Sequence, residues 1–95
     1  MYKFSAKAKK DLLSITQYTT EQFGLKQSNE YLRSLKETLD KISIFPRMVG
    51  RLRNEIGINI FSFVCKSHTI YYQQKQNYLF IIRILNNRMD HQKYL

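Results

Sequence analysis

The sequence predicts an α+β domain in which a short N-terminal strand (residues 2–4) and an antiparallel helical hairpin pack on a small, twisted antiparallel β-sheet. Two patterns of hydrophobic spacing predict this fold. Apolar residues recur at three- and four-residue intervals over residues 6–45, and at every second position from residue 58 onward. A chain of 95 residues supports one hydrophobic core, so we expect residues 1–95 to form a single domain.

The N-terminal half contains start and stop signals for two helices. Ser5 suits the N-cap of a helix over residues 6–23, and Gly24 suits its end because glycine adopts the left-handed conformation at little cost. A second helical pattern starts near Lys26 and continues to Pro46, which cannot extend a helix. The connection between the two helices is short, so they must form an antiparallel hairpin.

The C-terminal half is predicted to form an antiparallel meander. Its three alternating runs are residues 58–65, 68–74 and 78–85, separated by spacers short enough for hairpins. In the third run the alternation places Phe80 and Arg83 on opposite faces. We expect the Phe80 face to pack against the helices and the Arg83 face to form a concave, partly open surface.

Charge is distributed unevenly along the chain, whose formal net charge is +9. Residues 1–40 contain seven basic and five acidic side chains, whereas residues 41–95 contain nine and two. Such a positive field attracts polyanions or acidic protein segments. A loop predicted over residues 45–57 contributes Arg47, Arg51 and Arg53.

Several classes of function lack support in the sequence. The single Cys65 and two histidines have no metal-ligand spacing, and there is no phosphate-binding loop, so we expect neither a metal nor a cofactor. The helices offer no candidate for sequence-specific recognition of DNA by the chain alone, because their apolar faces are committed to the sheet. No segment is apolar enough for a signal peptide or a membrane span, so we expect a cytoplasmic protein without a membrane partner.

Four stretches together resemble the ParE toxins of bacterial toxin–antitoxin modules. They are AKAKKDLLSITQYTTEQFG, FPRMVGRLRNEI, HTIYY and IIRILNNRMDHQKYL, and they cover nearly the whole chain. The resemblance implies the fold of the RelE/ParE superfamily. It also implies a bacterial toxin that inhibits DNA gyrase by binding, without catalysis of its own, and that a cognate ParD-like antitoxin with an acidic or amphipathic C-terminal segment neutralises.

The resemblance and the charge pattern together suggest two binding surfaces. The surface expected to bind gyrase, alone or with its DNA, comprises Arg51, Arg53, Arg83, Arg88, Met89 and Asp90. The surface expected to bind the antitoxin comprises Leu12, Ile15, Tyr18 and Arg47. Arg83 has a second interpretation, in which its aliphatic stem covers neighbouring strand residues and its guanidinium reaches water or Asp90.

Two other functions remain open. A RelE-like ribosome-dependent mRNA endonuclease would need a base, an acid and a cation, for which His68, Arg83 and Tyr94 are the candidates. An attenuated toxin that retains only antitoxin binding is suggested by Phe61 and Asn86, which stand where many ParE members have arginine and histidine. As a structural residue, His68 would instead anchor a hydrogen bond at the hairpin.

Overall fold

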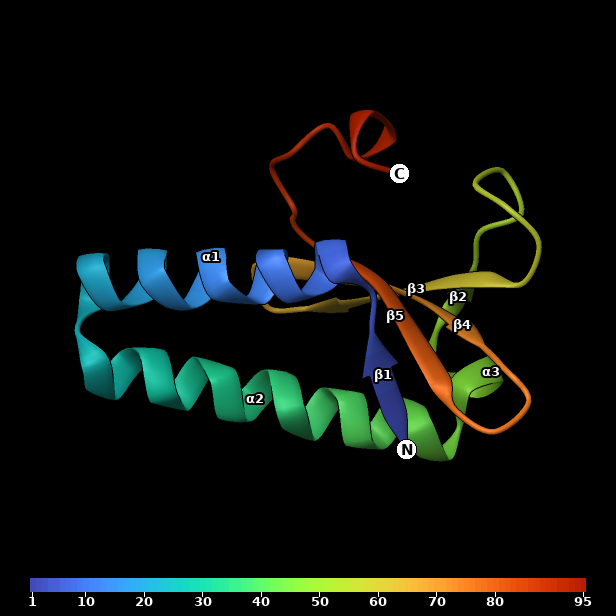
Figure 1. Cartoon of the computed structure of the whole chain (residues 1–95), viewed down its shortest axis with the longest axis horizontal. Helices are drawn as coiled ribbons and strands as arrows, with labels where there is room; N and C mark the ends of the chain where they lie inside the picture. Colours follow the sequence, from blue (N-terminus) through green and yellow to red (C-terminus); the bar gives the residue numbers. More distant parts are fainter.

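The computed structural model describes all 95 residues, as three α-helices and a five-stranded sheet (Figure 1). Across the sheet the strands are β1 (Tyr2–Phe4), β5 (Leu79–Asn86), β4 (His68–Gln74), β3 (Ile60–Cys65) and β2 (Arg51–Leu52). Strand β1 runs parallel to β5, and the other neighbours are antiparallel. The predicted α+β fold is confirmed, and the N-terminal strand makes its sheet mixed.

The first helix, α1 (Ala6–Phe23), begins and ends where the sequence indicates. The Ser5 side chain accepts a hydrogen bond from the Ala8 amide at 2.9 Å, which satisfies one of the unpaired donors at the helix start. Gly24 ends the helix with φ of 91°, in a region that side chains disfavour. The same residue precedes α2 (Leu25–Ile44), so a single glycine makes the turn of the hairpin.

One hydrophobic core lies between the helical hairpin and the sheet. The helices contribute buried residues at helical spacing, which are Ala8, Ile15, Leu35, Leu39 and Ile42. The central strands contribute Phe61, Cys65, Ile70, Tyr72, Leu79, Ile81 and Ile84. Because the two layers bury one another, neither is expected to be stable alone. No helix combines the length and the apolar character that crossing a membrane requires.

The prediction that Phe80 faces the helices is wrong. Strand β4 pairs Tyr71 with Arg83 and then Tyr72 with Ile81, so Ile82 is an extra residue in β5 and forms a β-bulge. The bulge reverses the alternation, so that both Ile81 and Ile84 enter the core. Strict period-two counting across Ile82 therefore assigns the first half of β5 to the wrong face.

The segment predicted as a loop, residues 45–57, is partly regular. It contains the single-turn helix α3 (Pro46–Val49), in which proline occupies a first-turn position, and the edge strand β2. The Tyr72 hydroxyl donates a hydrogen bond of 2.6 Å to the Pro46 carbonyl, and burial raises the pKa of Tyr72 to about 12. A Cβ atom on Gly50 would lie 1.8 Å from that hydroxyl, so only glycine fits there.

Candidate functional site

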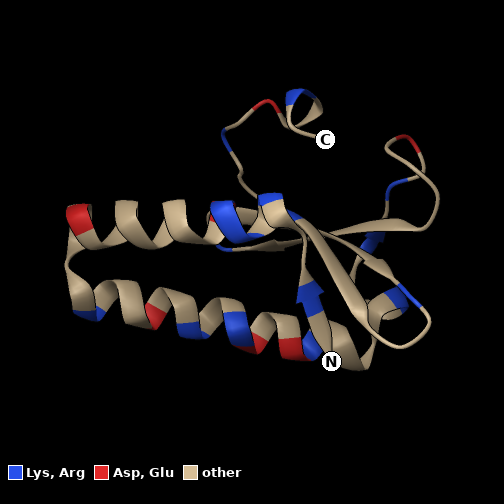
Figure 2. Ribbon diagram, viewed as in Figure 1, with Lys and Arg blue, Asp and Glu red and all other residues tan.

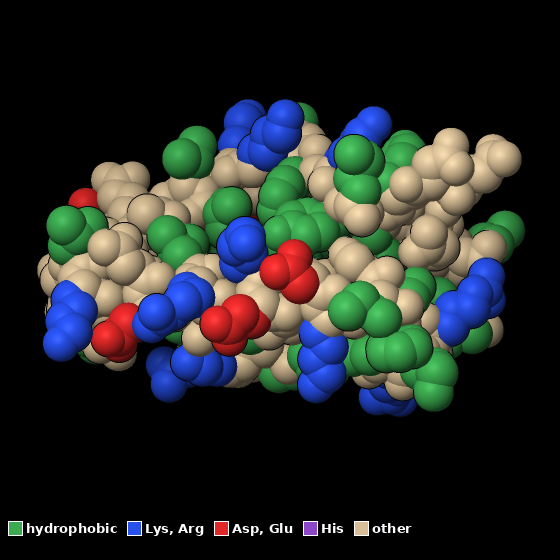
Figure 3. Space-filling model, turned by 90° about the horizontal axis from the view of Figure 1, so that it is seen from below, with side chains coloured by type: hydrophobic (Ala, Val, Ile, Leu, Met, Phe, Trp, Pro, Cys, Tyr) green, Lys and Arg blue, Asp and Glu red, His purple; other side chains and the backbone are tan.

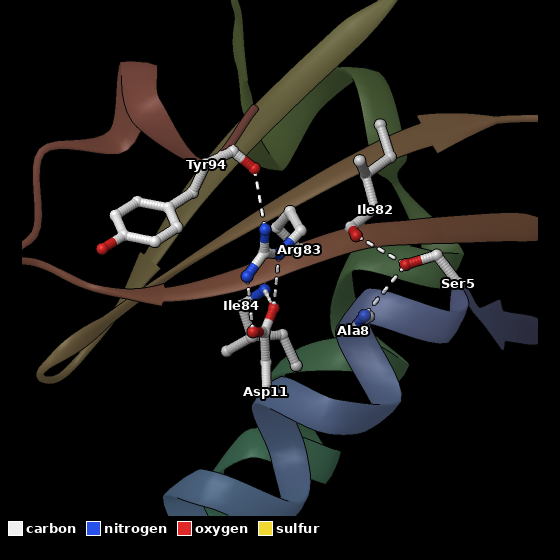
Figure 4. A network of polar contacts seen from close by, with 7 residues as sticks. All are labelled: Ser5, Ala8, Asp11, Ile82, Arg83, Ile84 and Tyr94. Carbon is white, nitrogen blue, oxygen red and sulfur yellow. Dashed lines mark hydrogen bonds and ion pairs between the residues drawn. The ribbon is translucent and has the colours of Figure 1, made fainter.

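The free edge of β5 is covered by the start of α1 (Figure 4). The Ser5 amide and hydroxyl donate to the carbonyls of Ile81 and Ile82, at 2.9 and 2.6 Å. Six residues later, an Asp11 carboxylate oxygen accepts a hydrogen bond of 3.0 Å from the Ile84 amide. Strand β1 pairs only with residues 79–81, so α1 satisfies backbone groups of β5 that β1 cannot reach.

Arg83 forms a two-pronged ion pair with Asp11. Its Nε and Nη2 atoms donate to the two carboxylate oxygens at 2.8 and 2.7 Å, and each side chain is only 13% exposed. The hydrogen bond to Asp11 raises the pKa of Arg83. A third hydrogen bond, from Nη1 to the Tyr94 carbonyl at 2.8 Å, holds the end of the chain (Figure 4). Arg83 thus joins α1, β5 and the C-terminus, and its predicted contact with Asp90 is absent because Asp11 is its partner.

The C-terminal residues 87–95, here called the tail, follow β5, and His91 of the tail packs on Tyr71 on the sheet face opposite the helices. His91 lies edge-on to Tyr71, accepts the Tyr71 hydroxyl on Nδ1 at 2.6 Å and donates from Nε2 to the Asn86 carbonyl at 2.9 Å. The Arg53 guanidinium lies 5.8 Å from the Tyr71 ring. Tyr71 is only 1% exposed, so this face is not the open concave surface expected from the sequence.

A groove of about 930 Å³ lies beside α1. Ile15, Tyr18 and Phe23 of α1 line it, and so do Arg88 and Met89 of the tail. Its polar floor includes His68, whose Nδ1 accepts the Tyr31 hydroxyl at 2.5 Å. Burial lowers the pKa of His68, which keeps the ring neutral near pH 7. The groove combines an apolar wall with a cationic rim.

The basic side chains face solvent more freely than Arg83 does. Arg47, Arg51 and Arg88 are exposed and form no ion pair. Arg53 binds Glu55 at 2.7 Å and the Ser62 hydroxyl at 3.2 Å, and the hydrogen bond to Glu55 raises the pKa of Arg53. Figure 2 shows acidic side chains mainly at the tip of α1 and along α2, which leaves the other end of the molecule predominantly basic.

The residues that the sequence suggested for gyrase binding are divided between several places. Arg51 and Arg53 lie at the β2 edge of the sheet, and Arg88 and Met89 lie on the groove rim. Asp90 is exposed in the tail, and Arg83 is bound to Asp11.

The suggested antitoxin-binding residues are also divided. Ile15 and Tyr18 line the groove, whereas Leu12 packs against the core and does not. Arg47 lies on α3, which follows the C-terminal end of α2, away from the hairpin turn (Figure 1). The structure therefore brings Arg88 and Met89 together with Ile15 and Tyr18 in one groove. The sequence analysis assigned these two pairs of residues to two different binding surfaces.

Of the three candidate nuclease residues, Arg83 and Tyr94 are in contact, with the guanidinium 5.8 Å from the centre of the Tyr94 ring, and His68 lies on the other face of the sheet. His68 faces the helices beside Tyr31, Tyr94 belongs to the tail, and Arg83 is neutralised by Asp11. His68 makes a hydrogen bond with Tyr31, as its structural interpretation expects. Asp11 is the residue of the network that the sequence did not suggest, because its contact with Arg83 joins positions far apart in the chain. No three His, Cys, Asp or Glu side chains gather where they could hold a metal ion.

Comparisons with known proteins agree with this architecture. The family model described as the ParE toxin of the type II toxin–antitoxin system parDE matches residues 2–91. Toxin ParE1 of Mycobacterium tuberculosis is 31% identical over 90 residues, which cover 94% of this chain and 91% of that protein. Toxin ParE1 of Caulobacter vibrioides is 29% identical over 94 residues, which cover 99% and 96%.

A solved structure shows the same fold. It is described as the chromosomal ParDE TA system from P. aeruginosa, and it superposes with a TM-score of 0.76 over 90% of this chain and 92% of that one, at 16% identity. The α-helical hairpin, the mixed sheet and the match along the sequence point to one assignment. The chain belongs to the ParE family and is the toxin component of a type II toxin–antitoxin system.

Proposed function

We propose that this toxin inhibits DNA gyrase by binding it, without catalysis, and that a ParD-type antitoxin neutralises the toxin. Inhibition of gyrase is what the resemblance to ParE toxins implies. The observation that favours binding over catalysis is that the candidate cation and the candidate base are each already engaged by other side chains of the fold. Arg83 has its charge offset by Asp11, and His68 is on the helix side of the sheet.

The Tyr71–His91 pair does not replace the missing catalytic set. Both ring nitrogens of His91 are engaged, one with Tyr71 and the other with the Asn86 carbonyl. The Tyr71 side chain is buried, so a phosphodiester has no access to its hydroxyl. A general base must reach the proton that it removes, and neither group does so in this arrangement.

For the contact with gyrase, we propose the exposed cations Arg51 and Arg88 together with Arg53, Met89 and Asp90. Arg83 has a different part in this contact, because its hydrogen bond to the Tyr94 carbonyl positions the tail. Exposed cations raise the rate of association with an acidic partner and contribute to its orientation.

For the antitoxin, we propose the groove beside α1. Ile15 and Tyr18 offer apolar contacts to an amphipathic helix or strand, and Lys66 and Arg88 on its rim suit acidic side chains. Arg47 lies outside the groove, on α3, so an antitoxin segment that is confined to the groove does not reach it.

The proposal is tested by titrating purified toxin into a gyrase supercoiling assay and scoring relaxed and cleaved plasmid. Arg88→Ala and Arg51→Ala should each raise the half-inhibitory concentration, by about tenfold if a hydrogen bond to a charged group is lost. Arg33→Ala, which removes an equal charge from the exposed side of α2, is the matched control and should inhibit like the wild type.

A ribosome and mRNA cleavage assay distinguishes the alternatives. Cut mRNA together with normal supercoiling would contradict the proposal and support the endonuclease. Growth that is unaffected by expression of the toxin alone, with no effect in either assay, would support the attenuated toxin.

A further inference from the structure

Four large apolar side chains are exposed together where α2 ends. Ile44, Phe45, Met48 and Leu52 are 68%, 54%, 83% and 45% exposed, and we call them the corner surface. They come from the end of α2, the turn of α3 and the short strand β2, which lie against one another. Seen from below, hydrophobic side chains gather over this end of the molecule (Figure 3). Exposed apolar clusters of this kind mark interaction sites in soluble proteins.

The corner surface is held in place by the fold. Tyr72 donates its hydroxyl proton to the Pro46 carbonyl, and Gly50 passes close to the Tyr72 ring, so α3 is fixed to the central strand β4. The Phe45 amide donates to the Lys41 carbonyl at 3.4 Å and continues the hydrogen bonding of α2. A fixed apolar surface loses little conformational entropy when a partner covers it.

The rim of the corner surface is cationic. Residues 41–54 include four basic side chains and no acidic one. Lys41, Arg47 and Arg51 are exposed and form no ion pair within the chain. An apolar centre within a charged rim is the usual composition of a protein–protein contact.

We propose that the corner surface docks an acidic, apolar-centred surface of the toxin's protein target. This inference rests on the proposed function, in which that target is gyrase. Nucleic acid would leave the four apolar side chains without partners, because a basic surface contacts mainly the phosphates of the backbone. A second copy of the chain would bring Arg47 and Arg51 of each copy close to their counterparts, and like charges repel. A membrane surface favours long amphipathic helices, and α3 is a single turn.

The corner surface is separate from the groove. The groove is lined by residues near the hairpin turn, such as Phe23 and Gln27, whereas Ile44 is the last residue of α2. At about 1.5 Å per residue, Gln27 and Ile44 are about 25 Å apart along that helix. Substitutions at the corner should therefore leave antitoxin binding in the groove intact.

The test compares Met48→Glu and Ile44→Glu with the matched control Leu13→Glu. Leu13 is 71% exposed on α1 and lies outside both surfaces, so it controls for placing a carboxylate on an exposed apolar position. We expect both corner variants to bind purified gyrase at least tenfold more weakly and to lose growth arrest on expression. Both should bind the antitoxin like the wild type, which also shows that they are folded. The Leu13→Glu protein should retain gyrase binding and growth arrest.

Several results would overturn the docking proposal. The first is that the corner variants arrest growth and bind gyrase like the wild type, and the second is that they lose antitoxin binding. The third is that the wild type forms dimers and the corner variants do not. The fourth is that the wild type binds vesicles of anionic phosphatidylglycerol and the corner variants do not. Failure of the proposed function looks different. If the wild type arrests growth without binding gyrase, and the corner variants alone lose that arrest, then the gyrase proposal fails and the docking surface stands.

Discussion

Replacing Asp11 by alanine should destabilise this small toxin more than its position on an exposed helix suggests. The carboxylate accepts three hydrogen bonds, two from Arg83 and one from the Ile84 amide, and both charged side chains are only 13% exposed. Removal of one partner of a buried ion pair leaves an uncompensated charge and costs about 3–5 kcal/mol. Because water still reaches this pair, we expect a loss of about 2–4 kcal/mol in the free energy of unfolding.

A double-mutant cycle with Arg83→Met isolates the interaction. Urea unfolding of the wild type, both single variants and the double variant should yield a coupling energy of about 1–3 kcal/mol, with similar m-values throughout. The exposed pair Lys36–Asp40, with side chains 73% and 54% exposed and atoms 3.9 Å apart, provides the control. Lys36→Ala should change stability by no more than about 0.5 kcal/mol.

A coupling energy near zero between Asp11 and Arg83 would contradict this prediction. It would mean that the two side chains are solvated separately and that their ion pair does not stabilise the contact between α1 and β5. A large loss in Asp11→Ala without coupling would assign the stabilisation to the Ile84 hydrogen bond alone.

Three further predictions concern the packing between helices and sheet. Gly50→Ala should cost about 1–3 kcal/mol in urea unfolding, because its Cβ would displace the Tyr72 hydroxyl; a cost below about 0.3 kcal/mol would show that the ring moves freely. Stability should fall as pH drops below about 6.5, because burial lowers the pKa of His68 in the folded state and the unfolded chain therefore takes up a proton first. In unfolding curves at pH 5–7, His68→Gln should reduce this pH dependence. Stability should also fall as pH rises from about 10 toward 12, because Tyr72 ionises at about pH 10 when unfolded and has a pKa of about 12 when folded. An unchanged alkaline dependence in Tyr72→Phe would contradict the assignment to Tyr72.

Local signals were sufficient to predict most of the secondary structure. Ser5, Gly24 and Pro46 act on their neighbours through capping, a left-handed φ and a missing amide proton, so their effects are legible in the sequence. The strand hairpins follow in the same way from alternation and short spacers. Family resemblance then placed these elements in a known fold.

The site was less predictable, because long-range contacts determine it. The bulge at Ile82 depends on how β5 pairs with β4, and no residue type in β5 indicates a bulge. Arg83 was expected to contact a partner protein or Asp90 of the tail, but it forms its ion pair with Asp11, which is 72 residues away in the chain. The anchoring of the tail by Tyr71 and His91 depends on the same tertiary register. Residue composition indicated the positive charge of the protein, but not which basic side chains form ion pairs within the chain.

Titration of purified toxin into purified gyrase, with the heat of binding followed at several salt concentrations, shows whether the toxin acts by binding gyrase. We expect saturable binding that weakens as salt rises, because exposed arginines contribute to the contact. The absence of saturable binding, from toxin that still arrests growth, would contradict this expectation.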